Sequence, residues 1–257
     1  MPGDLIPVRA EGGLRPDPLP RFRGTRPLKR WRYLGVFGED VLACFGEVAI
    51  GGVPQSFWAT WDGRALREQT RFRPGVVRVG EDEVRAPGAH LRLEPAGEPV
   101  EVRSPHGRHA IWTRKLPVRV RGVVAGREVD APGLVDESAG WHARVTAWSW
   151  SAGAGTAADG GPVWWNLVEG VHDDPRASER TVWAGGRAVE VGPVAFDGLD
   201  AVGGLRFTAE AERARHDRLV LLDSAYRQPF GRFTGTLPDG TVLREGRGVM
   251  ERHDVRW

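Results

Sequence analysis

Hydrophobic and polar residues alternate along much of the chain. Between Leu116 and Val124 the even positions are apolar or Gly, while Pro117, Arg119 and Arg121 take odd ones. A repeat of two is the pattern of a β-strand that buries one face and exposes the other. Residues 208–216 carry charges without the apolar stripe of a helix, so they are expected to form a hairpin end. The pattern predicts many short strands without a βαβ rhythm.

Turn signals separate these predicted strands. Asp62-Gly63, Gly185-Gly186 and Asp239-Gly240 each lie between apolar stretches, and such dipeptides favour the tight turns of β-hairpins. Short antiparallel strands joined by hairpins are typical of an all-β barrel or sandwich. The fold class predicted from the pattern is therefore all-β.

A faint internal repeat divides the chain. The motifs of the first half are, in order, Trp31-x-Tyr33, Gly51-Gly52, Phe57-Trp58 and Trp61 to Ala65, and those of the second are Trp148-x-Trp150, Gly160-Gly161, Trp164-Trp165 and Trp183 to Ala188. Chance recurrence in a Gly- and Trp-rich chain is one interpretation, and two related β units joined near 127–139 is the favoured one. It predicts a Pro-rich arm at 1–20 and units at 21–130 and 140–257.

Composition excludes several classes of function. The 257 residues carry 36 Lys+Arg against 34 Asp+Glu, and only Lys29 and Lys115 are lysines. No basic block of the kind that binds nucleic acid occurs. No apolar run has the length of a signal peptide or a membrane span, so we expect a cytoplasmic protein. The single Cys44 rules out an intramolecular disulfide.

Motifs for common cofactors are also missing. The chain has no Gly-x-Ser-x-Gly elbow, no phosphate-binding Gly-x-x-x-x-Gly-Lys and no His-Glu-x-x-His. Its seven histidines lack the spacing of metal ligands. We therefore expect neither a metal nor a nucleotide cofactor.

Several motifs resemble an uncharacterised bacterial family of unknown function. They are Trp31-x-Tyr33, the segment 148–155 with Asn166-Leu167, the ending Phe230-Gly231-x-Phe233-x-Gly235, and Gly248 to Glu251. The family is distantly similar to tandem lipocalin-like proteins, among them the carotenoid 1,2-hydratases (hydroxyneurosporene synthases). The resemblance implies two tandem calycin β-barrels, or one elongated double barrel, around an apolar cavity. It implies no particular reaction.

The stretch 141–151 is a candidate cavity wall. His142, Arg144, Trp148 and Trp150 share one strand parity, which gives that side large aromatic and hydrogen-bonding groups. Ligand cavities have this character. The alternative is that His142 and Arg144 lie in water at a rim while the tryptophans pack in the core.

The polar insertion from Leu167 to Arg180 supplies acid–base candidates. Glu179 is the predicted proton donor if burial raises its pKa, and Asn166 and His172 are the predicted positioning groups. The alternative is a solvated surface loop. Glu251 next to Arg252 is interpreted as a surface or rim ion pair, and Tyr226 as a ligand anchor or a core residue.

Together these features predict a barrel interior that binds a bulky hydrophobic or polycyclic metabolite. The interior is expected to be lined by Trp31, Trp58, Trp148, Trp150, Trp164, Trp165 and Trp183. Acid–base chemistry such as hydration, cyclisation or isomerisation is one hypothesis, and a non-catalytic carrier is its rival. A third is a packed interior with function at the surface. The ligand hypotheses require a pocket of about 300 Å³, and the enzyme hypothesis requires a carboxyl group inside it.

Overall fold

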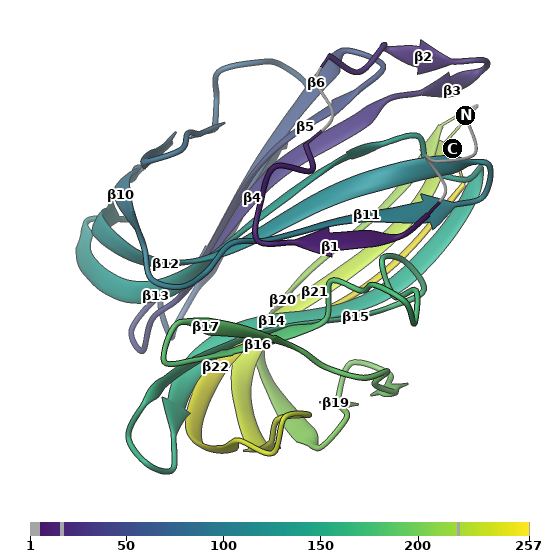
Figure 1. Cartoon of the computed structure of the whole chain (residues 1–257). Coiled ribbons are helices and arrows are strands. Elements are labelled where there is room, and N and C mark those ends of the chain that lie inside the picture. Colours follow the sequence, from purple (N-terminus) through teal and green to yellow (C-terminus); the bar gives the residue numbers. More distant parts are fainter. Residues whose placement is uncertain (1–5, 16–17, 220–221, 257) are drawn as a thin grey trace.

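The chain folds entirely as β-structure. The computed structural model describes residues 6–15, 18–219 and 222–256, and within these ranges it contains strands and turns but no helix. Accordingly, no helix among the described residues has the length and apolar character to cross a membrane. The strands form two large antiparallel sheets, one from each half of the sequence (Figure 1), which confirms the predicted all-β class with two tandem units.

The first sheet contains eleven strands within the described residues. They are β1 (Val8–Ala10), β4 (Lys29–Phe37), β5 (Leu42–Ile50), β6 (Val53–Trp61), β7 (Leu66–Arg71), β8 (Arg78–Val79), β9 (Glu83–Ala86), β10 (Ala89–Pro95), β11 (Val100–His106), β12 (His109–Val124) and β13 (Arg127–Gly140). A separate hairpin consists of β2 (Phe22–Arg23) and β3 (Arg26–Pro27).

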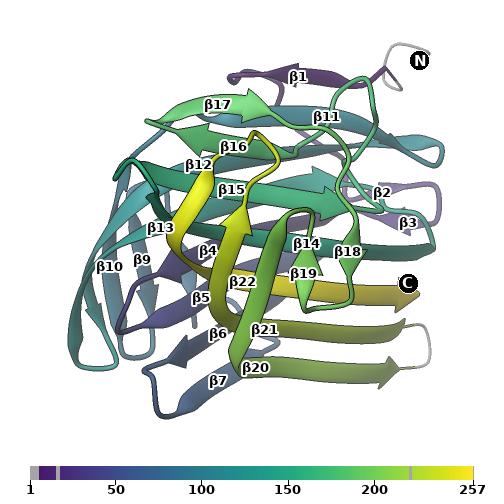
Figure 2. The same ribbon diagram turned by 90° about the horizontal axis from the view of Figure 1, so that it is seen from below.

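The second sheet contains nine strands within the described residues. They are β14 (Val145–Ala157), β15 (Pro162–Glu169), β16 (Thr181–Ala184), β17 (Arg187–Glu190), β18 (Phe196–Asp197), β19 (Ala201–Val202), β20 (Leu205–Leu219), β21 (Leu222–Thr236) and β22 (Val242–Arg256). Figure 2 shows this sheet in front of the first.

Both sheets follow the same strand order. The first runs β7-β6-β5-β4-β13-β12-β10-β9-β8, and the second runs β17-β16-β15-β14-β22-β21-β20-β19-β18. In each unit the first long strand therefore pairs with the last, so β4 and β13 are the topological equivalents of β14 and β22. The three predicted hairpin turns join β6 to β7, β16 to β17 and β21 to β22.

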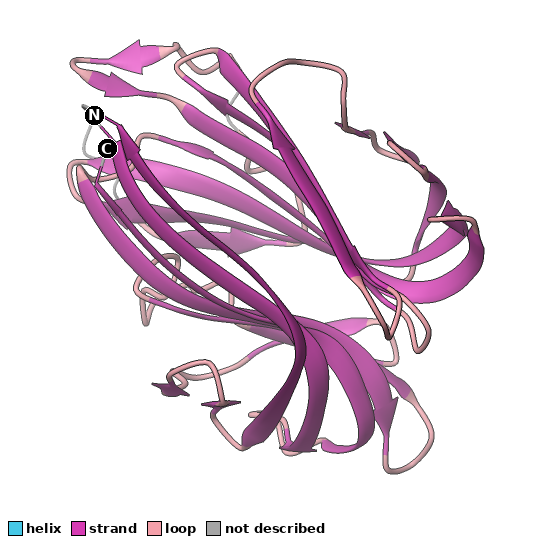
Figure 3. Ribbon diagram, turned by 180° about the vertical axis from the view of Figure 1, so that it is seen from behind, coloured by secondary structure: helices cyan, strands magenta, loops and turns pink. Residues whose placement is uncertain are grey.

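Hydrophobic residues form three separate clusters. One lies within the first curved sheet and includes Leu34 and Leu91, and one lies within the second and includes Trp165 and Met250. The third contains residues of both halves, among them Tyr33 and Trp150, and packs one sheet against the other. Figure 3 shows the two curved sheets crossing at this contact. Long strands here are therefore buried on both faces.

Two segments depart from the expected organisation. Residues 127–139, expected to link the units, lie in strand β13 of the first sheet. Asp136 and Glu137 gave this segment its linker-like polarity, yet both are buried. The stretch 208–216, expected at a hairpin end, lies inside the long strand β20.

Only part of the sequence repeat follows the topology. Trp31-x-Tyr33 lies in β4 and Trp148-x-Trp150 in the equivalent strand β14. The glycine pairs are not equivalent, because Gly51-Gly52 joins β5 to β6 whereas Gly160-Gly161 joins β14 to β15. The same order of motifs along the chain therefore mixes equivalent and non-equivalent positions.

Candidate functional site

A cavity of about 210 Å³ lies between the two units. We call it the central cavity. Its walls combine aromatic, aliphatic and polar side chains: Trp31, Arg32, Tyr33, Val48, Ile50, Gln55, Phe57, Phe72, Lys115, Asp136, His142, Trp148, Trp150, Val168, Val171, His172, Glu179, Arg213, Arg215, Asp217, Ser224, Tyr226, Glu251 and His253. Phe72 is 59% exposed, so the cavity reaches solvent on that side.

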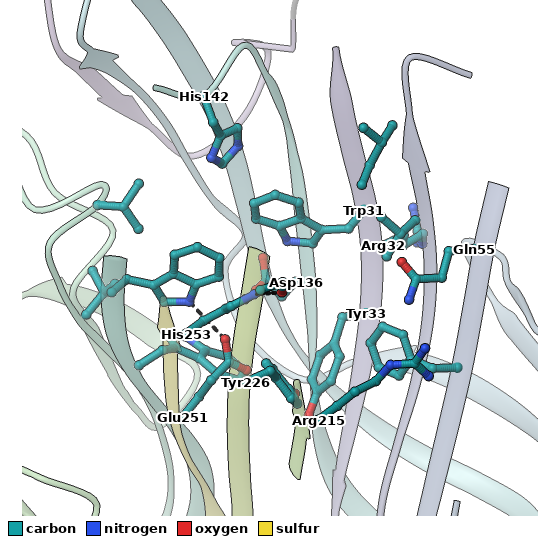
Figure 4. A pocket seen from close by; sticks show the side chains of 18 of the residues that line it. Trp31, Arg32, Tyr33, Gln55, Asp136, His142, Arg215, Tyr226, Glu251 and His253 are labelled. Atoms are coloured by element: carbon teal, nitrogen blue, oxygen red, sulfur yellow. Dashed lines mark hydrogen bonds between the residues drawn. The ribbon is translucent and has the colours of Figure 1, made fainter. Parts of the chain in front are cut away.

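The tandem architecture brings the walls together. Trp31 and Tyr33 lie on β4, and Trp148 and Trp150 lie on the equivalent strand β14. The rings of Tyr33 and Trp150 meet edge to face with their centroids 5.6 Å apart. Figure 4 shows Trp31 and Tyr33 on one side of the cavity and Glu251, Tyr226 and His253 on the other. Neither unit alone forms this space.

A buried carboxyl group projects from the last strand of the second unit. Glu251 on β22 lies opposite Trp150 of β14 in the sheet and is only 8% exposed. Trp148 Nε1 donates to its Oε1 at 2.8 Å, and Gln228 Nε2 donates to its Oε2 at 2.9 Å. We call Trp148, Gln228 and Glu251 the second polar cluster.

Burial raises the pKa of Glu251 to about 7. The hydrogen bonds from Trp148 and Tyr226 and the charge of Arg213 lower this pKa, whereas the charge of Asp136 raises it further. Desolvation dominates because a carboxylate loses more hydration than these neutral donors return. A carboxyl group with a pKa near 7 is partly protonated at neutral pH and can therefore donate a proton.

A second carboxyl group occupies the equivalent place in the first unit. Asp136 on β13 lies opposite Tyr33 on β4 and opposite Lys115 on β12. Lys115 Nζ lies 2.5 Å from Asp136 Oδ1 and 3.2 Å from Oε1 of Glu179, which comes from the other unit. We call Lys115, Asp136 and Glu179 the first polar cluster.

Electrostatics within the first polar cluster keep Lys115 charged. Burial lowers the pKa of Lys115, but the charges of Asp136 and Glu179 outweigh burial and raise it overall. The pKa of Asp136 is raised by burial and by the charge of Glu179, against the opposing effect of Lys115. One ammonium is thus shared between two buried carboxyl groups.

The loop 170–180 places His172 and Glu179 in the cavity wall. The Glu179 amide donates to the His172 carbonyl at 2.9 Å, which closes the loop. Asn166 Nδ2 donates to the Glu179 carbonyl at 2.9 Å, while its Oδ1 accepts from Trp150 Nε1 at 2.7 Å. Arg9 of the N-terminal segment donates to the Ser178 carbonyl at 2.6 Å. These bonds hold Glu179 in place from several elements.

His172 adopts an unusual backbone conformation. Its φ is +54°, in the left-handed region that side chains other than Gly seldom occupy. Burial and the charge of Lys115 lower its pKa to about 3, so the ring is neutral at physiological pH. His172 Nδ1 lies 2.8 Å from Ser104 Oγ, and its Nε2 has no hydrogen-bond partner among the described residues.

The residues predicted from sequence fall into two groups. Those that line the central cavity are His142, Trp148, Trp150, His172, Glu179 and Tyr226. Asn166 lies behind the wall and holds Trp150 and Glu179. The insertion that contains His172 and Glu179, for which a solvated loop was the alternative, turns both side chains inward.

Five predicted residues, Trp58 among them, lie away from the central cavity. Arg144 is exposed. Trp165 packs against Phe233 in the second core, and Trp183 donates from Nε1 to the Glu98 carbonyl between the units. Trp164 lines a different cavity, of about 680 Å³, at the other end of the contact between the units. Adjacent residues of a strand point to opposite faces, so Trp164 and Trp165 cannot share one wall.

The location of the cavity also differs from the expectation. It lies between the units rather than inside a barrel, because each barrel-like unit is filled by its own core. Trp58, expected in the lining, packs against the first core instead.

Sequence reasoning missed Lys115 and Asp136 and misplaced Glu251. Glu251 was interpreted as a rim ion pair, but its neighbour Arg252 points the other way and pairs with Asp254. One signal was present for Lys115. The chain has 34 arginines and only two lysines, Lys29 and Lys115, and both lysines are 2% exposed.

Metal ions are bound by groups of His, Cys, Asp and Glu side chains. Among residues 6–15, 18–219 and 222–256, no group of three or more His, Cys, Asp or Glu side chains is positioned to hold an ion. The chemistry that the described residues offer is acid–base chemistry and hydrogen bonding.

Three solved structures are similar to the chain over most of its length. A protein provisionally assigned as AttH from Nitrosomonas europaea shares 13% identity, with 90% of this chain and 93% of that chain covered and a TM-score of 0.41. Kievitone hydratase from Nectria haematococca shares 11% identity, with 87% and 88% covered and a TM-score of 0.46. CghA, solved with Sch210972, shares 10% identity, with 97% of each chain covered and a TM-score of 0.37.

Sequence comparison identifies the family. No curated protein matches the chain significantly. A family model described as a domain of unknown function, DUF2804, matches residues 114–257, which include β13 and the whole second sheet. Because this match spans more than half of the chain, the protein belongs to the DUF2804 family.

Proposed function

We propose that the protein binds a small organic molecule in the central cavity and transfers a proton to it from Glu251. The observation that carries this proposal is a buried carboxyl group with a pKa of about 7 in the wall of an aromatic cavity. Hydration, cyclisation and isomerisation of an alkene or carbonyl compound can each begin with such a proton transfer.

Glu251 fits the role of acid better than Glu179. Glu179 forms an ion pair with Lys115, and its carbonyl accepts from Asn166. Glu251 accepts hydrogen bonds from the neutral donors Trp148, Gln228 and Tyr226, and the charge of Arg213 acts on it without an ion pair. A carboxyl group beside neutral donors in a desolvated site retains its proton readily.

The cavity limits the size and character of the ligand. A volume of about 210 Å³ lies below the range of roughly 300–1,000 Å³ typical of pockets for drug-sized ligands, and below the pocket of about 300 Å³ that a bulky ligand was expected to require. We therefore propose a ligand whose enclosed part is one or two rings, with any further part extending past Phe72 into solvent. The faces of Trp31, Trp148 and Trp150 supply apolar contact and stabilise positive charge that develops on protonation.

The proposal is tested by incubating the protein with a small-molecule extract of its host and following conversion by mass spectrometry. The wild-type protein should retain a ligand and deplete it. Glu251→Gln should retain the ligand but convert it at least about 100-fold more slowly than the wild type. The control is Glu245→Gln, on the same strand, whose side chain is 68% exposed.

Two results would contradict the proposal. Retention of a ligand by the wild type without any conversion would identify a carrier. Unchanged conversion by Glu251→Gln would remove Glu251 from the reaction.

A further inference from the structure

The charges that line the central cavity do not balance locally. Arg213 pairs with Glu68 at 3.0 Å, and Arg215 pairs with Asp217 at the cavity entrance. Arg32 pairs with two carboxylates outside the lining, Glu81 and Glu137. Of the lining cations, this leaves Lys115 to face Asp136 and Glu179 together. Arg9, which is not among the lining residues, adds a positive charge near Glu179.

The charge imbalance coincides with unused hydrogen-bonding atoms. Glu179 is 2% exposed, and its Oε1 lies beside Lys115 and Asn166 while its Oε2 has no hydrogen-bond partner among the described residues. His172 is 5% exposed, and its Nε2 is likewise without one. A buried acceptor without a donor destabilises the folded protein, and a charged acceptor does so more strongly. A ligand that supplies donors would offset this destabilisation.

We propose that the ligand carries a protonated amine, which binds to Glu179 Oε2 and His172 Nε2 as the missing partner of the first polar cluster. This assignment rests on the proposed function and adds the chemical class of the ligand. An ammonium group supplies three donors from one compact charge. The ligand's ammonium and Lys115 would then form ion pairs with the two carboxylates, Glu179 and Asp136. With Nδ1–H donating to Ser104 Oγ, His172 presents Nε2 as an acceptor.

Two further features fit a cationic ligand. His172 is neutral, because burial lowers its pKa to about 3, so its ring adds no repulsive charge. Its backbone holds the ring in the wall with a left-handed φ of +54°, and such strain concentrates at binding sites. Glu251, in the second polar cluster, stays available to act on the ring body of the same ligand.

The test compares two probes of the same shape. Calorimetry measures the binding of 2-naphthylmethylamine and 2-naphthylmethanol to the full-length protein at pH 7. The amine should bind the wild type at least about tenfold more tightly than the alcohol. Glu179→Gln should abolish this preference. Glu179→Asp, which retains the charge, should restore part of it, and Glu169→Gln, an exposed neighbour, should change neither affinity.

The outcomes separate the two proposals. Equal affinities of the wild type for amine and alcohol would overturn the ammonium assignment and leave the cavity as a binding site. Failure of both probes to bind would overturn the proposed function and the assignment with it. If Glu179→Gln does not fold, the ratio of the amine and alcohol affinities of the wild type decides the ammonium assignment.

Discussion

The two units place a carboxyl group at equivalent positions and surround it differently. Asp136 and Glu251 each lie on the last strand of their unit, opposite Tyr33 on β4 and Trp150 on β14. The neighbouring side chain on the next strand is the ammonium of Lys115 in the first unit and the amide of Gln228 in the second. The same backbone frame thus supports a charged cluster and a neutral one.

This difference shows how one fold can supply two kinds of chemistry. Lys115 binds Asp136 and also reaches Glu179, so it joins the two units through buried ion pairs. Gln228 satisfies an oxygen of Glu251 without adding charge, and burial then raises the pKa of Glu251 to about 7. The neighbour's charge, rather than the fold, separates an ion-pair site from a proton-donor site.

Removal of Lys115 should have the largest effect. Lys115→Met leaves Asp136 and Glu179 buried without a cation, and the loss of one partner from such a site costs about 3–5 kcal/mol. Gln228→Met removes only a neutral donor and should cost about 1–3 kcal/mol. Urea denaturation at pH 7 measures both. Equal losses would show that charge does not distinguish the clusters.

Replacement of Glu251 should change how stability depends on pH. The pKa of Glu251 is about 7 in the folded protein, against an ordinary value of 4.5. Between these values the folded state holds a proton that the unfolded chain has lost. The contribution of Glu251 to the free energy of unfolding therefore falls as pH rises through this window and is constant above it.

Glu251→Gln removes this pH-dependent loss of folding stability. From pH 4 to pH 8 the variant should gain about 3 kcal/mol relative to the wild type, at 1.36 kcal/mol per pKa unit. Gln228 can turn its amide to present its unpartnered oxygen to the new side chain. Urea denaturation across this range measures the difference, and parallel pH profiles of the two proteins would contradict the raised pKa.

Gln228→Lys should make the second cluster resemble the first. An ammonium within hydrogen-bonding distance of Glu251 is expected to lower the pKa of that carboxyl group by about 1–3. Carbon-13 NMR of labelled Glu side chains follows the titration, with Glu251→Gln to assign the signal. Any conversion that depends on Glu251 as an acid should fall with its pKa. An unmoved titration would show that burial alone sets the pKa.

The smallest effects should come from the two tryptophans that donate hydrogen bonds. Trp148→Phe and Trp150→Phe each remove one indole donor, at a cost of about 1–2 kcal/mol. Trp148 donates to Glu251, whereas Trp150 donates to Asn166. Only Trp148→Phe should therefore raise the pKa of Glu251, as seen in the same NMR titration. A similar rise in both variants would point to a general loosening of the cavity.

The alternation of side chains predicted the all-β class and the three hairpin turns correctly, because hairpin geometry is local. It predicted less about the site, since the rule assumes one buried and one wet face. On β22, Met250 lies in the second core while Glu251 faces the central cavity, so both parities are buried. Glu251 therefore had the sequence context of a surface residue. Its burial depends on the first unit, which lies far away along the chain.

Glu179 was selected as a candidate from its local sequence, which does not depend on how the sheets pack. It stands in a polar insertion near Asn166, and the two side chains do meet, with Asn166 Nδ2 3.4 Å from Glu179 Oε1. Lys115 was missed because nothing near it in sequence carries its partners. Asp136 reaches it across a strand pair and Glu179 from the other unit. Contacts between units leave no periodic trace in a single strand.

The position of the cavity between the sheets determines its stoichiometry. Two units of the same strand order would be expected to carry two pockets if each barrel bound its own ligand. Here Tyr33 and Lys115 come from one unit, and Trp150, Glu179 and Glu251 from the other, around one space. The central cavity should therefore bind one molecule per chain, and a fragment that contains either unit alone should bind none.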